Sequence, residues 1–148
     1  VSRSSTAIPL SETSRVSSDI IEKQRANVTN KDVNSIDAMH NLKEQAQMMK
    51  EALLRGEVDR IGEILNYGWL HKKNMAAGIS NSFIDNIYDQ AIAAGATGGK
   101  ISGAGGGGFM IFYAPENNKY KVIEALNQLG GRVMRYTFSQ IGMTSWTV

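Results

Sequence analysis

The sequence predicts an α+β fold in which a small antiparallel sheet packs against several helices, and three observations support this fold class. Apolar residues recur at steps of three and four between residues 14 and 95, as they do in amphipathic helices. Residues 95–108 hold eight of the 15 glycines, and the uninterrupted apolar run 109–113 follows them directly. Near the C-terminus, at 134–138, apolar and polar residues alternate as in a half-buried strand.

The composition is that of an ordinary globular protein and fits one domain. The 148 residues are 42% apolar and 20% charged, which is enough to bury a core without disulfides or structural metals. With 16 basic and 14 acidic residues the net charge is +2, and no basic run of the kind that binds nucleic acids is present. We therefore expect a small-molecule partner and no nucleic acid.

Several function classes are excluded by what the sequence lacks. It has no cysteine, which excludes disulfides, thiolate catalysis and cysteine-bound zinc and fits a reducing compartment. His40 and His71 are too far apart to form a helical pair of metal ligands, so no metal-binding residue is assigned. No apolar segment approaches the ~18 residues that span a bilayer, and the N-terminus lacks the apolar centre of a signal peptide. We expect a cytoplasmic protein without a membrane partner.

The N-terminal segment differs from the rest of the chain. We interpret residues 1–12, rich in serine and threonine, as a lead-in that is foreign or disordered, with a short extended piece at 6–10, and residues 13–148 as the domain. A helix is expected over about 13–25. Arg15 lies in its first turn, where a basic residue opposes the helix dipole. Its charge is therefore expected to serve another purpose, with a solvated arginine without a role as the alternative.

Three further helices are predicted by apolar stripes at helical spacing. The first covers 33–53 and ends at Gly56, the second covers 58–73, and the third covers 82–92 and ends at Gly95. Because a short connection joins the first two helices, we expect them to be antiparallel.

Polar residues at the ends of these helices have ordinary structural explanations. Ser82 and Asp85 have the spacing of a capping box at the start of the third helix. The basic residues 71–73 complement the negative C-terminal end of the second helix and need no further role. We assign His40 no chemical function.

Strands are expected on both sides of the glycine-rich stretch. Residues 97–102 precede it, and residues 109–113 follow it without polar alternation, as expected for a central strand covered by helices on one side. The remaining predicted elements are a helix over 115–129 and strands over 134–138 and 144–148, the last with Trp146 and Val148 on one face.

The glycine-rich stretch has the parts of an anion-binding nest. Lys100, Ser102 and the unobstructed N–H groups of 103–108 predict a phosphate ligand. A dinucleotide-binding turn is excluded because an apolar, β-type run follows the last glycine where that motif requires a helix. A P-loop is excluded because Ile101, and not serine or threonine, follows Lys100. A strand, a glycine turn and a strand remain, for which a glycine-rich hairpin that accommodates a packed helix is the structural alternative.

Residues 95–109 resemble the third conserved motif of the GHMP kinases, the superfamily of galactokinase, homoserine kinase and mevalonate kinase. The likeness extends over roughly residues 13–148. Further segments resemble the C-terminal half of the D-glycero-D-manno-heptose 7-phosphate kinases, namely 13–21, 35–43, 49–53, 69–73 and 145–146.

This resemblance implies a ferredoxin-like GHMP kinase C-terminal domain. It also implies a kinase that uses ATP and Mg²⁺ and phosphorylates the anomeric hydroxyl of a heptose 7-phosphate. In such kinases the third motif lies between two domains, near the phosphates, although Lys100 could instead pair with a carboxylate of the other domain. The residues that the resemblance places around the phosphates are Lys100, Ser102, Gly103, Ala104, Gly105, Gly106 and, for the substrate phosphate, Arg15.

The sequence departs from the family by lacking its N-terminal domain, with the ATP phosphate loop and the catalytic acidic residue. We therefore expect the C-terminal part of a kinase that is inactive alone, whose partner is the N-terminal kinase domain. An exposed apolar face would then allow self-association. The alternative function is a non-catalytic small-molecule binding or regulatory module with a ferredoxin-like sheet, and a structural interaction domain comes third.

Overall fold

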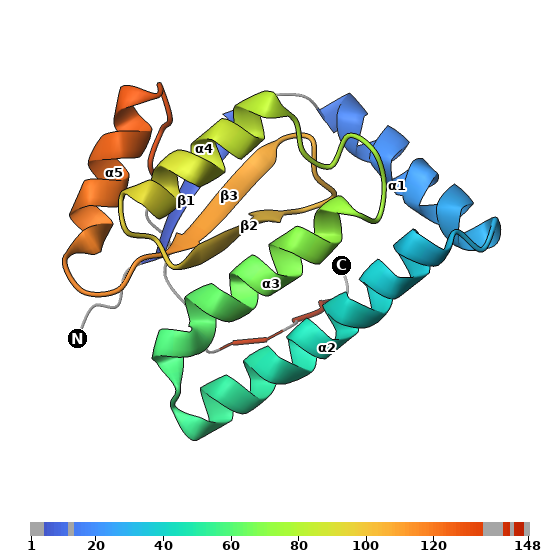
Figure 1. Ribbon diagram of the computed structural model, residues 1–148, viewed down its shortest axis with the longest axis horizontal. Helices are drawn as coiled ribbons and strands as arrows, with labels where there is room; N and C mark the ends of the chain where they lie inside the picture. The colour runs from blue at the N-terminus through green and yellow to red at the C-terminus, as the bar shows by residue number, and fades with distance from the viewer. Residues whose placement is uncertain (1–4, 12–13, 135–140, 143, 147–148) are drawn as a thin grey trace.

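A computed structural model describes residues 5–11, 14–134, 141–142 and 144–146 and confirms the predicted α+β fold (Figure 1). The three strands form one antiparallel sheet in the order β1-β3-β2. The elements in chain order are β1 (Ser5–Ser11), α1 (Ser14–Thr29), α2 (Val33–Arg55), a 3₁₀ turn η1 (Val58–Arg60), α3 (Ile61–Lys73), α4 (Ser82–Ala93), β2 (Gly98–Ser102), β3 (Gly108–Tyr113) and α5 (Asn118–Gln128).

The strand that follows the glycines is central, as predicted. β3 pairs with β2 on one side, with Lys100 opposite Ile111 and Ser102 opposite Phe109, and with β1 on the other. Met110 is fully buried, while Phe109 is 42% exposed. This alternation follows from the two-residue period of a strand, which turns neighbouring side chains to opposite faces.

Residues 5–11 form an edge strand of the sheet, so they are not a loose lead-in. The extended piece expected at 6–10 is confirmed and is slightly longer, and its register with β3 shifts between Pro9 and Ser11. The second edge of β3 presents backbone N–H and C=O groups that need partners, and β1 supplies them. Residues 1–4 and 12–13 lie outside the described residues, and the domain boundary at residue 13 stays a prediction.

The caps of the long helices follow local chemistry, with one correction. Gly56 ends α2 with a left-handed φ of 72°, as predicted. Asn81, and not Ser82, caps α4, because its backbone is extended and its side-chain oxygen accepts the Ile84 N–H at 3.0 Å. Asp85 accepts a hydrogen bond from Ser80 Oγ at 2.7 Å, so the expected capping box does not form.

The C-terminal predictions are only partly tested. The helix after β3 is confirmed as α5, whereas most of the strand expected at 134–138 lies outside the described residues. The final strand expected at 144–148 is wrong over 144–146, which have no regular structure, and Trp146 is 81% exposed. Val148 lies outside the described residues.

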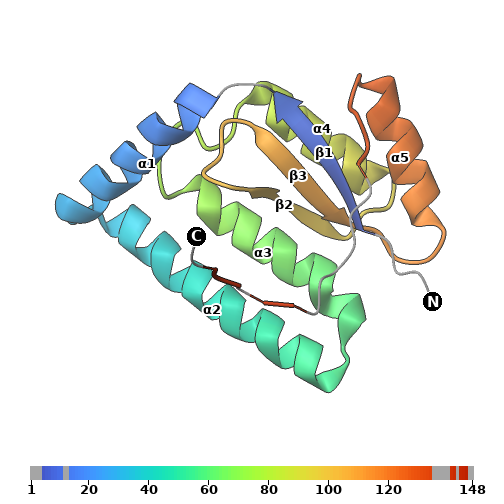
Figure 2. The same cartoon turned by 180° about the vertical axis from the view of Figure 1, so that it is seen from behind.

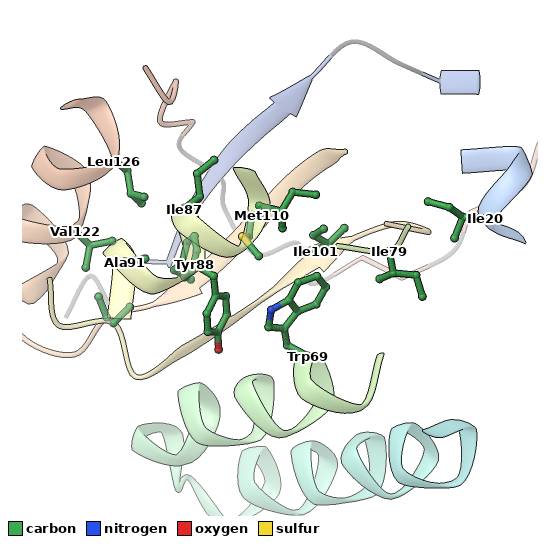
Figure 3. Packing of buried hydrophobic residues seen from close by; sticks show 14 of the residues in the cluster. Ile20, Trp69, Ile79, Ile87, Tyr88, Ala91, Ile101, Met110, Val122 and Leu126 are labelled. Atoms are coloured by element: carbon green, nitrogen blue, oxygen red, sulfur yellow. The ribbon is translucent and has the colours of Figure 1, made fainter. Parts of the chain in front are cut away.

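The core lies between the sheet and the helices that cover one of its faces. α4 and α5 lie over the face that carries Met110 and Phe112, and the view from behind shows the strands in front of α4 (Figure 2). Trp69 of α3, Tyr88 of α4 and Phe112 of β3 form a row of rings with centroid separations of 6.1 and 5.8 Å. Trp69 is fully buried, and its Nε1 finds no acceptor among the described residues (Figure 3).

Helix α3 lies directly along β2, and two glycines permit this approach (Figure 1). A Cβ atom at Gly98 would overlap the carbonyl oxygen of Gly62, and one at Gly62 would overlap the side chain of Thr97. On its other side α3 packs against α2, where Gln45 Nε2 donates to the Ile64 carbonyl at 3.2 Å. None of the helices among the described residues has the length and apolarity needed to cross a bilayer.

Replacing Gly98 should therefore destabilise the fold. In Gly98→Ala the new methyl group meets the backbone of α3, which cannot move without disturbing the core, so we expect a loss of about 1–3 kcal/mol in the free energy of unfolding. Gly142→Ala is the matched control, because a Cβ atom there meets nothing within 4 Å. Urea denaturation followed by circular dichroism measures both variants, and equal stabilities would contradict the close contact.

Candidate phosphate-binding loop

The loop between β2 and β3 has a backbone that only glycine adopts easily. Gly103, Gly105, Gly106 and Gly108 have φ angles of +117°, +119°, +72° and +91°. Side chains with a Cβ atom rarely occupy this region, because the Cβ atom crowds the neighbouring peptide groups. The glycine content that stands out in the sequence is thus a requirement of the loop conformation.

The loop is anchored on the segment that joins α3 to α4. The Gly106 N–H donates to the Ile79 carbonyl at 2.9 Å. A Cβ atom at Gly105 would lie 2.8 Å from the Cα of Ile79, so the two backbones touch. Ala104 packs against the hydrophobic core at the base of the loop. These contacts fix the loop relative to α3 and α4.

Two lysines lie beside the loop. Lys72 lies in the last turn of α3, and its Nζ donates a hydrogen bond to the Gly103 carbonyl. Lys100 belongs to β2. Burial lowers the pKa of Lys72, and the charge of Lys100 lowers it further; burial also lowers the pKa of Lys100. Within the described residues, no acidic side chain pairs with either lysine. Two partly desolvated, adjacent positive charges favour an anion.

The predicted site residues differ in how far the fold uses their polar groups. Lys100 and Ser102 alternate with the buried Ile101, so they share the sheet face opposite α4. The N–H groups of residues 103–105 have no acceptor among the described residues, although Gly105 itself is buried against Ile79. By contrast, Gly106 uses its N–H within the fold, and the Ala104 side chain packs against the hydrophobic core.

The structure describes the backbone of Arg15 but not its side chain. Arg15 is the second residue of α1. Ser11, four residues earlier, pairs with Gly108 at the end of the glycine loop. Four residues span at most about 14 Å, so the start of α1 lies near this end of the loop.

Lys72 is a candidate site residue that sequence reasoning missed. It was explained as a complement to the negative end of its helix, and the Gly103 carbonyl that it binds is 31 positions away in the chain. No local pattern signals a contact over that separation. No group of three acidic or histidine side chains that could hold a metal lies together in the described part of the chain.

Comparison with known proteins decides the family. The family model "GHMP kinases C terminal" matches residues 49–132, which include α3, α4 and the whole glycine loop. This chain belongs to the GHMP kinase family. Among its relatives, D-glycero-alpha-D-manno-heptose 7-phosphate kinase of Campylobacter jejuni is 37% identical over 143 residues, which is 97% of this chain and 42% of that protein.

Solved structures share the fold of this chain. The Lin0012 protein of Listeria innocua superposes with a TM-score of 0.81 at 14% identity, over 98% of this chain and 42% of that one. L. major mevalonate kinase in complex with R-mevalonate superposes with a TM-score of 0.78 at 18% identity, over 89% of this chain and 41% of that one. The chain thus spans less than half the length of each of these relatives.

The contact between the loop and Ile79 predicts a difference between two glycine substitutions. Gly103→Ala and Gly105→Ala both impose strain of about 1–3 kcal/mol at a positive φ. Only Gly105→Ala also presses on the Ile79 backbone, whereas a Cβ atom at Gly103 meets nothing within 4 Å. We expect Gly105→Ala to be less stable than Gly103→Ala by about 1 kcal/mol or more in thermal unfolding. Equal stabilities would mean that the loop does not rest on Ile79.

The proximity of the two lysines is tested by titration. In Lys100→Gln the pKa of Lys72 should rise, because a neighbouring positive charge that disfavours its protonated form is removed. NMR titration of the lysine side-chain carbons measures this pKa directly. Lys50→Gln, on the exposed side of α2, is the control and should leave it unchanged. An unchanged Lys72 pKa in Lys100→Gln would place the two charges too far apart to interact.

Proposed function

We propose that this chain is the C-terminal part of an ATP-dependent sugar kinase that transfers the γ-phosphoryl group to the anomeric hydroxyl of D-glycero-D-manno-heptose 7-phosphate. The observation that carries this proposal is the 37% identity to a heptose 7-phosphate kinase over 97% of the chain. Two lysines beside the glycine loop, which have no carboxylate partner in the described part of the chain, give it a physical basis.

In this proposal the loop neutralises and positions phosphate oxygens. Phosphoryl transfer depends mainly on charge stabilisation and alignment, because the protein has little covalent chemistry to perform. Lys72 and Lys100 supply positive charge, and the N–H groups of residues 103–105 supply donors. An anion bound there would favour the protonated form of both lysines, whose pKa values burial lowers in its absence. Arg15 is our candidate for a contact to the substrate phosphate.

The rest of the machinery is assigned to a part of the kinase that this chain does not span. We place the ATP site, the Mg²⁺ ligands and the catalytic acidic residue there, and we expect the 148-residue chain alone to be inactive. We also expect the isolated chain to self-associate through an apolar face that the rest of the kinase would cover. The cysteine-free composition fits a cytoplasmic enzyme.

A chimera tests the function. The part of the Campylobacter jejuni kinase that precedes its aligned region is joined to this chain, and phosphorylation of heptose 7-phosphate is measured with ATP and Mg²⁺. We expect turnover by the chimera and none by the 148-residue chain. In the chimera, Lys100→Gln should lower kcat/KM about a hundredfold through loss of charge at the phosphate, whereas Lys50→Gln should not.

Three outcomes would count against the proposal. Turnover by the isolated chain would contradict its incompleteness. A stable chimera without kinase activity would favour the non-catalytic binding module. If Lys100→Gln lowered the thermal stability of the chimera but left kcat/KM unchanged, Lys100 would be a structural partner of a carboxylate and not a phosphate ligand.

A further inference from the structure

A polar pocket lies between the first half of α2 and the last turn of α3, two antiparallel helices that run side by side (Figure 1). Its volume is about 440 Å³, within the range of small-molecule sites. It is formed by residues that neither the family likeness nor the glycine loop assigns to any role. The lining residues are Asn34, Asp37, Ala38, Asn41, His71 and Asn74.

Three side chains of this open pocket, Asn34, Asp37 and Asn74, are exposed to solvent, so a ligand would bind them by displacing water. Among the described residues, none bonds to or pairs with the side chains of Asn34, Asp37 or Asn74. Asn41 Oδ1 lies 2.9 Å from the Tyr67 hydroxyl, which leaves the two N–H donors of that amide free. The pocket therefore offers a carboxylate acceptor together with several amide donors and acceptors.

The walls of the pocket are held in place by the neighbouring packing. The Tyr67 hydroxyl also lies 3.1 Å from Glu44 Oε2, and its ring meets the His71 ring edge-on at a centroid distance of 4.5 Å. Ala38 lines the pocket and is buried, so a larger side chain at this position would reduce its volume. Because Asn41 and His71 are fixed through Tyr67, part of the polar surface is organised before a ligand arrives.

This set of groups suits a ligand rich in hydroxyl groups. A hydroxyl both donates and accepts, so it can satisfy the Asp37 carboxylate and the surrounding amides together. A phosphate would be repelled by Asp37, and an apolar ligand would leave the polar groups unpaired. The position of the pocket also favours a contact with the substrate, because His71 lines the pocket while the next residue, Lys72, binds the glycine loop. Successive residues project about 100° apart on a helix, so the two sites lie on adjacent sides of the last turn of α3.

We propose that this pocket binds hydroxyl groups of the sugar substrate, while the glycine loop and its lysines receive phosphate. The inference rests on the proposed function for the identity of the sugar. It adds a specificity site to that function, with Asp37 as the principal acceptor and Asn34, Asn41 and Asn74 as further hydrogen-bonding partners.

Binding by the 148-residue chain is tested by NMR titration with two separate probes. D-mannose, which shares the ring configuration of the heptose and carries no phosphate, should shift the amide signals of residues 34–41 and 71–74. Inorganic phosphate should shift those of residues 103–105 instead. Asp37→Asn should weaken mannose binding about tenfold, and the control Asp59→Asn, on the exposed turn η1, should not. Absence of mannose-induced shifts around the pocket at about 50 mM, well above the millimolar affinities of weak ligands, would overturn the proposal.

The chimera separates this inference from the function on which it rests. There, Asp37→Asn should raise KM for heptose 7-phosphate about tenfold while KM for ATP and the thermal stability stay unchanged. Turnover by the unmodified chimera with the same KM in Asp37→Asn would support the kinase function and overturn the pocket as a substrate site. A chimera without turnover would overturn the proposed function, and the mannose titration would still decide whether the pocket binds hydroxyl groups.

Discussion

The close approach of α3 to β2 is the constraint on which the rest of the structure depends. Gly62 and Gly98 allow the two backbones to meet where any side chain would overlap the opposite element. This contact places the end of α3 beside the loop that leaves β2, and Lys72 reaches the Gly103 carbonyl from there. A wider spacing would move this positive charge away from the loop, since a lysine side chain can bridge only a limited gap.

The same helix connects the loop with the rest of the domain. On one side α3 meets β2, and on the other Gly68 lets Gln45 of α2 pack against it and bond to its backbone. The last turn of α3 therefore borders both the glycine loop and the polar pocket. A single rigid element thus sets the distance between the two places where we expect a substrate to be held.

The elements that were predicted correctly from the sequence are those determined by residues close to one another in the chain. The end of α2 at Gly56 and the central position of β3 follow from a left-handed glycine cap and from an apolar run without alternation. Lys72 was missed because its contact joins distant segments. Residues 5–11 were assigned to a lead-in because they form a strand only by pairing with β3, which lies about a hundred positions away in the chain. No local pattern in these residues indicates that partner. The glycine loop was recognised, but which of its N–H groups the fold uses, as at Gly106, depends on Ile79 and could not be inferred locally.

The two tryptophans of the chain occupy opposite environments. Trp69 is fully enclosed, with the Lys73 ammonium 5.6 Å from its ring centre, whereas Trp146 is 81% exposed. Indole fluorescence depends on the polarity around the ring, so one chain carries both a core reporter and a surface reporter. A soluble quencher reaches Trp146 first, and the emission that survives it comes from the ring that packs beside Tyr88 in the core. The intrinsic tryptophan fluorescence of the protein can therefore report on the core around Trp69 without an attached dye.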